Sequence, residues 1–154
     1  MAYNALDLID KAIDIVNNKL NIYKRILMEE DLNTMVLVRN AFIKECEKSI
    51  LYYKELEHKL QDKELEEIDF VVYDKISFLI NEFNGKHYNG KVKNIKELKE
   101  FTLNYEKDTL ALLIDIQGRL IKKESDINSI AYEVLNKIIK KRKEYIGSLK
   151  EYIK

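Results

Sequence analysis

The chain has 154 residues and contains no proline and only four glycines. These two residues supply the backbone conformations that most tight turns require, so a chain this poor in both cannot connect many short strands. A β-sandwich, a β-barrel and a Rossmann-type alternation of strands and helices are therefore not expected. Hydrophobic residues make up 46% and charged residues 35% of the chain, which is typical of a folded globular protein.

Charge and cysteine content exclude several classes of partner. Basic and acidic residues number 27 each, so no net positive charge would drive binding to nucleic acid or to an anionic membrane. The single cysteine, Cys46, rules out an internal disulfide and a cysteine-rich metal site, and it suits a reducing compartment. Neither a signal peptide nor an apolar run of about 18 residues is found. A cytoplasmic protein with no membrane or nucleic-acid partner is expected.

Hydrophobic residues recur at alternating steps of three and four, which predicts long amphipathic helices. The expected helices cover residues 4–29, a second segment ending near 60, and segments 63–84, 95–122 and about 126 to the end. In the first helix the apolar positions are Leu6, Ile9, Ile13, Val16, Leu20, Tyr23 and Leu27. In the second they are Phe42, Cys46, Ser49, Tyr53, Leu56 and Leu60. Expected N-caps are Asn4, Asp62 and Asn94, the last in a capping box with Glu97.

Short turns between long helices predict antiparallel neighbours. We expect one helical domain over residues 1–154. An extra N-terminal helix would occupy 1–32 and a first hairpin 33–84. A crossover loop would follow over 85–93, and a second hairpin over 94–154.

The two hairpins read as one repeat. The first begins at Glu47 with EKSILYYKELEHKLQDKELEEIDF, and the second begins at Glu106 with EKDTLALLIDIQGRLIKKESDINSIAYEVLNKIIKKRKEY. This pattern, with phrases such as YKEL and VLNKIIKKRKEY, resembles the ferritin-like superfamily and its rubrerythrin-type proteins over residues of about 40 to 154. The resemblance implies a ferritin-like antiparallel four-helix bundle of two hairpins joined by a crossover loop, with the N-terminal helix as an addition.

Active proteins of this type hold two irons with one Glu from the first helix of each hairpin and a Glu-x-x-His pair from the second. The resemblance places Glu106 on one Glu position and Cys46 on the other, with Glu45 or Glu47 there if the register slips by one. The two Glu-x-x-His pairs would fall on Arg142 and Tyr145 and on Ile76 and Leu79. Most ligands are therefore missing, and the chain is interpreted as a degenerate member with no catalytic or cofactor-binding residue.

A buried carboxylate is costly unless a positive charge accompanies it. Glu106 lies about 17 residues before the turn of the second hairpin and Arg142 about 18 after it. The two side chains are thus expected at one level of the bundle. We predict a buried Glu106–Arg142 pair, in which the guanidinium supplies the positive charge that iron supplies in active relatives.

Other motifs have simpler interpretations. Glu55 and His58 form a literal Glu-x-x-His, but each lies about 200° from the apolar seam of its helix and should face water. His87 is interpreted as a polar loop residue. The basic run over residues 137–143 is interpreted as a solvated helix face, with anion binding as a weaker alternative.

The function expected is a structural or partner-binding role rather than an enzyme. No cofactor is predicted. The alternative is an iron-binding diiron protein in iron handling or peroxide defence, with metal candidates Glu45, Glu47, Glu106, Glu55 and His58. A partner would be a second copy or another protein, because apolar residues recur on outer helix faces. These are Ile22, Ile26, Ile114 and Ile121.

Overall fold

The computed structural model describes residues 2–26, 33–86 and 92–153 of the chain. These residues form an all-α fold, as predicted, and contain no β-strand beyond one isolated bridge. The helices are α1 (Ala5–Arg25), α2 (Asn33–Leu60), α3 (Phe70–Gly85), α4 (Ile95–Arg119) and α5 (Ile130–Ile153), with a short 3₁₀ helix η1 (Glu124–Asn128) before α5. None of these helices is both long enough and apolar enough to cross a membrane.

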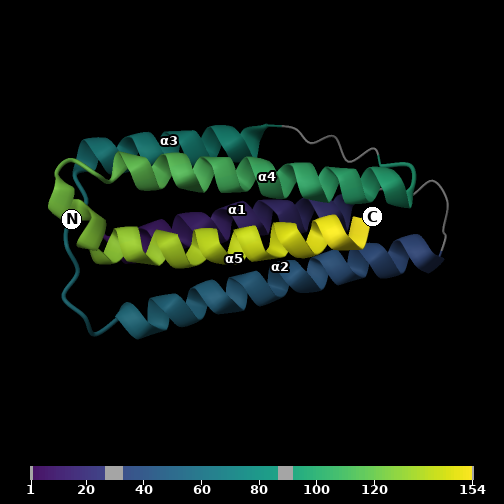
Figure 1. Ribbon diagram of the computed structural model, residues 1–154, viewed down its shortest axis with the longest axis horizontal. Helices are drawn as coiled ribbons and strands as arrows, with labels where there is room; N and C mark the ends of the chain where they lie inside the picture. Colours follow the sequence, from purple (N-terminus) through teal and green to yellow (C-terminus); the bar gives the residue numbers. More distant parts are fainter. Residues whose placement is uncertain (1, 27–32, 87–91, 154) are drawn as a thin grey trace.

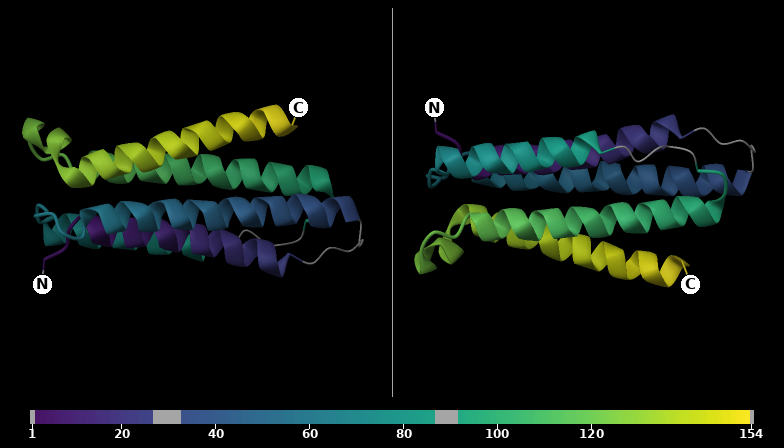
Figure 2. Two further views of the ribbon diagram at one scale, coloured as in Figure 1. Left: turned by 90° about the horizontal axis from the view of Figure 1, so that it is seen from below. Right: turned by 90° about the horizontal axis from the view of Figure 1, so that it is seen from above.

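The helices lie side by side in two layers (Figures 1 and 2). One layer contains α3, α1 and α2, with α1 between the other two, and the second contains α4 and α5. The most extensive packing joins α1 to α2 and α4 to α5, each pair running antiparallel. The hydrophobic core lies between the layers and includes the expected α2 seam, of which Cys46 and Tyr53 are 0% and 2% exposed.

Helix α1 is a central element, which corrects its interpretation as an addition to the bundle. It contacts α2, α3 and α5 and buries ten of its 21 residues. Ile22 and Ile26, expected on an outer face, are buried inside, while Ile114 and Ile121 are exposed. The reason is that α1 carries a wider apolar face than a single seam, because Leu8, Ala12 and Ile15 are buried beside the predicted positions.

The expected helix over 63–84 begins only at Phe70, so the predicted hairpin 33–84 is replaced by a different pairing. Residues 61–63 form a turn and bend, and the chain then continues without helix to Asp69. The Ile68 N–H donates a hydrogen bond to the Tyr3 carbonyl at 2.7 Å. This segment carries the chain across the end of the bundle, so that α2 packs along α1 and α3 lies on the other side of α1 (Figure 1).

Acidic side chains hold this crossing segment in place. Asp69 is the N-cap of α3: its carboxylate accepts from the Val71 N–H at 2.9 Å and pairs with Lys122. Glu66 accepts from the Ile130 N–H, at the start of α5, at 3.1 Å. The expected cap Asp62 is exposed in the turn and begins no helix. The acidic turn read from the sequence therefore connects elements at the bundle end instead of starting a helix.

The other predicted ends are close to those observed. Asn4 caps α1 in a capping box with Asp7, and Asn94 accepts from the Glu97 N–H at 2.9 Å at the start of α4. The fifth helix begins at Ile130, because residues 124–128 form η1 and leave Ile127 45% exposed. The break at Asp31 and Leu32, and most of the crossover loop 85–93, lie outside the described residues.

The cap assignment can be tested by paired substitutions. Asp69→Ala removes the cap of α3 and the contact with Lys122, and should lower the thermal midpoint because the first N–H groups of the helix lose their acceptor. Asp62→Ala, seven residues earlier in the same acidic segment, should leave the midpoint unchanged. Equal midpoints for the two variants in circular dichroism melting would contradict the observed start of α3.

Candidate functional site

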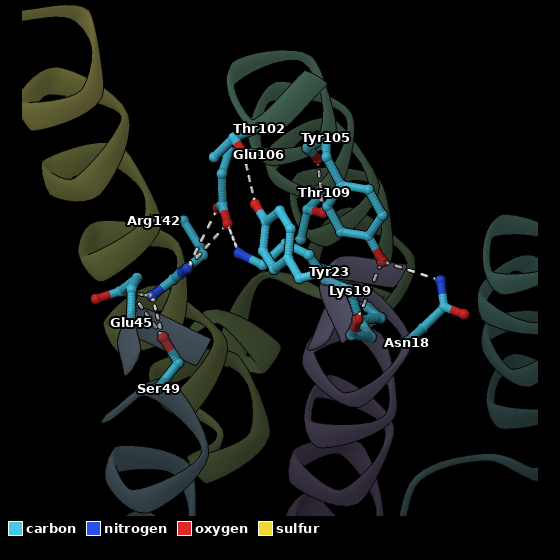
Figure 3. Close-up of polar contacts among 11 residues, drawn as sticks. Asn18, Lys19, Tyr23, Glu45, Ser49, Thr102, Tyr105, Glu106, Thr109 and Arg142 are labelled. Carbon is cyan, nitrogen blue, oxygen red and sulfur yellow. Dashed lines mark hydrogen bonds and ion pairs between the residues drawn. The ribbon is translucent and has the colours of Figure 1, made fainter. Parts of the chain in front are cut away.

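Four charged side chains meet in the interior, one from each of four helices (Figure 3). Lys19 comes from α1, Glu45 from α2, Glu106 from α4 and Arg142 from α5. Lys19, Glu106 and Arg142 are 2%, 1% and 4% exposed, and Glu45 lies at the edge of the group with 24% of its side chain exposed. We call these four residues the central charge cluster.

Glu106 is the residue that joins the two cations. Arg142 donates from Nη1 to both carboxylate oxygens of Glu106, at 3.3 and 3.2 Å, and Lys19 Nζ donates to Glu106 Oε1. The predicted Glu106–Arg142 pair is therefore present and buried. The structure adds Lys19 as a second cation on the same carboxylate, so that Glu106 carries ion pairs to both α1 and α5.

The second carboxylate of the cluster is reached through Arg142. Its Nη2 donates to Glu45 Oε1 at 3.0 Å and to Ser49 Oγ at 2.7 Å. The Ser49 hydroxyl in turn donates to Glu45 Oε1 at 2.8 Å. Arg142 thus crosses from α5 to α2 and also to α4. The cluster contains two cations and two carboxylates, so its formal charges balance within the interior.

Burial and pairing act in opposite directions on the ionisation of these groups. Burial alone would raise the pKa of Glu106, but Lys19 and Arg142 hold that pKa below its ordinary value. Burial alone would lower the pKa of Arg142, but Tyr53, Glu106 and Glu45 raise it further above its ordinary range. Both members of the Glu106–Arg142 pair therefore stay charged near neutral pH.

The thiol and phenol groups around the cluster are protonated and unreactive near neutral pH. Burial raises the pKa of the Cys46 thiol to about 11 and that of the Tyr53 hydroxyl to about 12. Burial, with Glu106 and Glu45 nearby, also raises the pKa of Tyr145. The Tyr145 ring packs against both cations, with its centroid 5.6 Å from Lys19 Nζ and 5.4 Å from Arg142 Cζ. Cys46 is therefore a buried apolar residue and not an activated nucleophile.

Further polar contacts continue the link between the two layers. The Tyr23 hydroxyl and the Thr102 hydroxyl lie 2.7 Å apart. Tyr105 donates from its hydroxyl to the Ile15 carbonyl at 3.1 Å and accepts from Asn18 Nδ2 at 3.1 Å. All of these contacts join α1 to α4 (Figure 3). They satisfy buried polar groups and fix the level at which the two helices face each other.

The structure does not bring all the metal candidates to one place. Glu106 and Glu45 share Arg142, whereas Glu47, Glu55 and His58 are exposed on α2. The exposure of Glu55 and His58 agrees with the prediction that they face water. Within the described ranges no group of three or more His, Cys, Asp or Glu side chains is placed to hold a metal ion. The positions implied for the other pair, Ile76 and Leu79, are apolar and lie on α3, away from α2.

The basic run and the loop histidine have different outcomes. Lys137, Lys140, Lys141 and Lys143 are exposed on α5, while Arg142 alone points inward. His87 lies outside the described residues. Open cavities lie elsewhere; one of about 550 Å³ lies at the bundle end beside Asp69 and Lys122. The central charge cluster lines none of the cavities described, so its geometry is that of an internal cross-link.

Lys19 is the member of the cluster that sequence reasoning missed. It occupies a second apolar stripe of α1, and all other members of that stripe are buried hydrophobic residues. The stripe is Leu8, Ala12, Ile15, Lys19, Ile22 and Ile26. A lysine at step four after Ile15 and step three before Ile22 is a signal for a buried cation. This pattern is visible in the sequence, but it predicts a buried cation only if the second stripe of the helix is covered. A peripheral helix would leave that stripe exposed, whereas a central helix buries it.

A second perturbed carboxylate lies outside the cluster, where α2 faces α1. Partial burial and a hydrogen bond with Asp10 raise the pKa of Glu57 to about 7. Lys54 opposes the shift but does not cancel it. The protonated form of Glu57 is therefore favoured at the α1–α2 contact.

Removing the carboxylate of Glu106 should destabilise the fold strongly. Glu106→Gln leaves Lys19 and Arg142 with only Glu45 as counter-charge, and we expect a loss of about 3–5 kcal/mol in the free energy of unfolding. The double variant Lys19→Met/Glu106→Gln leaves the balanced Arg142–Glu45 pair and should lose less than Glu106→Gln alone. Urea denaturation measures both, and a double variant less stable than the single one would contradict this charge balance.

The Glu106 contribution should also depend on pH. The pKa of Glu106 in the folded protein lies below its ordinary value of 4.5, so its stabilisation is complete above that value and is lost as the pH falls through the folded pKa. The stability difference between the native chain and Glu106→Gln should therefore shrink only in acid.

The contribution of Glu57 to stability should depend on pH in the opposite direction to that of Glu106. Its folded pKa of about 7 is raised above the ordinary 4.5, so the folded state favours the protonated form. That advantage is complete below about pH 4.5 and is lost as the pH rises through 7. Glu57→Gln stays neutral and should be more stable than the native chain at pH 8 but not at pH 4. Glu55→Gln, two residues away and exposed, is the control; an equal effect of Glu57→Gln at both pH values would contradict the shift.

Comparison with known proteins gives no relative from which a role could be transferred. The central charge cluster, the helix pairing and the surface are therefore the whole basis for a functional conclusion. No protein-family model, no curated protein and no solved structure matches this chain.

Proposed function

We propose that this chain is a ferritin-like bundle in which ion pairs take the place of a metal centre, and that it serves a structural or partner-binding role. The observation that carries the proposal is the central charge cluster, to which α1, α2, α4 and α5 each contribute one charged residue. Bundles of the ferritin-like type build their diiron sites in the same way, from one or two inward residues on each of four helices.

The order and direction of the helices support this proposal. The hairpins α1–α2 and α4–α5 are joined by one long connection, which includes α3, and α2 and α4 run in the same direction (Figure 1). A ferritin-like fold likewise has a single long crossover between two hairpins. The expected hairpin 33–84 is not needed for this, because α1 takes the part of its first helix and α3 belongs to the crossover.

Three of the four residues of the central charge cluster fit this revised register, and Glu45 lies one residue before the position of Cys46. Lys19 and Glu106 lie on the two helices that would each give a single Glu. Arg142 and Tyr145 lie on α5 at the spacing of a Glu-x-x-His pair, and Cys46 and Ser49 lie at that spacing on α2. Cys46 and Ser49 thus replace Ile76 and Leu79 as the positions of the second pair. Of these six positions only Glu106 keeps a carboxylate.

The replacement of metal ions by basic side chains has a physical reason. A metal centre brings positive charge that neutralises inward carboxylates, and here Lys19 and Arg142 bring that charge permanently. An incoming divalent cation would meet the Lys19 ammonium and the Arg142 guanidinium. It would find few vacant carboxylate oxygens, since Glu106 already binds both of these groups. The interior is therefore complete without metal, and the role of the protein lies on its surface.

Metal analysis tests the proposal directly. Protein purified from iron-supplemented medium should contain no stoichiometric iron, and neither a chelator nor added Mn²⁺ should change its thermal midpoint. About two irons per chain would overturn the proposal and support the diiron alternative.

A designed variant tests the ferritin-like register separately. Lys19→Glu/Arg142→Glu would place four carboxylates in the interior, together with Glu45 and Glu106. Without metal this variant should be strongly destabilised by like charges, and Mn²⁺ should raise its thermal midpoint. The matched control is Lys19→Met/Arg142→Met, which should gain nothing from Mn²⁺. Failure of Mn²⁺ to stabilise the carboxylate variant would contradict the register.

A further inference from the structure

Helix α3 presents apolar side chains on two opposite faces. Its inner face buries Tyr73, Ile76, Ile80 and Phe83 against the rest of the protein. Its outer face leaves Phe70, Val71 and Phe78 exposed by 64%, 72% and 51%. Three of the nine exposed large hydrophobic residues thus belong to the shortest α-helix of the described chain. Exposed apolar residues gathered on one side of a helix indicate a candidate interaction surface.

The exposed apolar residues lie on one side of the helix, with the exposed Asp74 and Lys75 between Val71 and Phe78. Val71 and Phe78 are seven residues apart, which is nearly two helical turns, so they lie on one line along the helix. Phe70 adjoins Val71, and Tyr3 stacks on the Phe70 ring with centroids 6.2 Å apart. We call Phe70, Val71, Phe78 and the charged residues beside them the outer face of α3. Scattered exposed hydrophobics need no explanation, but an aligned stripe of aromatic and aliphatic residues favours an interface.

Charged residues beside the stripe indicate which partner covers it. Lys75 and Glu82 are exposed, and they too are seven residues apart along one flank. In an antiparallel pair of identical helices, residues on one flank face the same flank of the partner in reverse order. If the two-fold axis lies level with the midpoint between Phe78 and Leu79, Lys75 of each copy faces Glu82 of the other. This places one attractive pair on each side of a Phe78–Phe78 contact.

The outer face of α3 is therefore complementary to itself in both apolarity and charge. Self-complementarity is the requirement of a two-fold interface, in which one surface patch must fit its own copy. The Lys75 ammonium already lies over the Phe78 ring, 5.0 Å from its centroid, and so is held along the stripe. An unrelated partner would not require Lys and Glu to follow each other at a spacing that matches under two-fold symmetry.

We propose that α3 pairs antiparallel with α3 of a second copy through a Phe78–Phe78 contact and reciprocal Lys75–Glu82 ion pairs. This inference rests on the proposed partner-binding role and gives that role a partner. A single helix pair covers less surface than the roughly 1,200 Å² of a standard stable interface, so the association should be reversible and concentration-dependent.

Sedimentation velocity from about 5 to about 500 μM protein tests the proposal, because a weak dimer has its dissociation constant in this range. The native chain should pass from monomer to dimer, and Phe78→Glu should weaken association at least tenfold, because it sets two carboxylates against each other at the two-fold axis. Leu51→Glu is the matched control: Leu51 is 62% exposed on α2, away from the stripe, and its substitution should have no effect. A native chain that stays monomeric throughout, as it would if a different protein covered α3, overturns the proposal.

Charge reversal tests the antiparallel register. Lys75→Glu alone sets two carboxylates against each other on each side of the two-fold axis, and Glu82→Lys alone sets two ammonium groups there, so each variant should dimerise less than the native chain. Mixing the two variants should restore association, because Glu at 75 then faces Lys at 82 and Lys at 75 faces Glu at 82. A mixture no stronger than its components would overturn this register.

Failure of this inference is distinguishable from failure of the proposed function. Metal content is measured on the same samples as sedimentation. A dimer with stoichiometric iron would defeat the metal-independent bundle and leave the interface intact, whereas a metal-free monomer would do the reverse. Because every substituted residue is exposed, unchanged circular dichroism is expected and shows that loss of association is not loss of folding.

Discussion

The arrangement of this bundle depends on keeping the carboxylate of Glu106 charged in the absence of water. A lone ionised carboxylate at this depth would be strongly unfavourable, and the chain answers with two cations from two other helices. Without Glu106, Lys19 would lose its ion pair and Arg142 would keep only the one with Glu45. Lys19 and Arg142 must both reach Glu106, and this is possible only at one axial register of the helices. The position of α4 relative to α1 and α5 is therefore fixed.

Apolar packing alone would specify that register less sharply. Long seams of leucine and isoleucine can slide by one helical turn at modest cost, because one aliphatic contact replaces another. Directional contacts cannot slide in this way: Tyr23 needs Thr102, Tyr105 needs the Ile15 carbonyl, and Arg142 needs Glu45 and Ser49 at one level. We infer that these contacts contribute more to specifying the arrangement than to its net stability, which is the best-attested role of buried polar groups.

Part of the candidate site could be predicted from the sequence. The pairing of Glu106 with Arg142 follows from equal distances to a turn between two helices, because the α4–α5 hairpin is local and its register is set by chain length. Lys19 and Glu45 could not be assigned in the same way. Their partners lie 87 and 97 residues away, and nothing in the local pattern tells which helix faces which. The prediction of a helix start at Asp62 was wrong for a related reason. The carboxylates of Glu66 and Asp69 bind groups near the start of α5, which are distant in the sequence.

The sequence by itself determined that the chain is helical, where most helices begin and end, and, apart from α1, which side of the helices is buried. These properties depend on local propensity, capping and the period of the apolar residues. Only the tertiary structure decided that α1 is central, that α2 packs on α1 instead of α3, and that Lys19 joins Glu106. An apolar seam predicts that a helix face is buried, but it does not predict which other helix covers that face. The pairing among similar apolar faces depends on their shape and on the few buried charged residues that must contact one another.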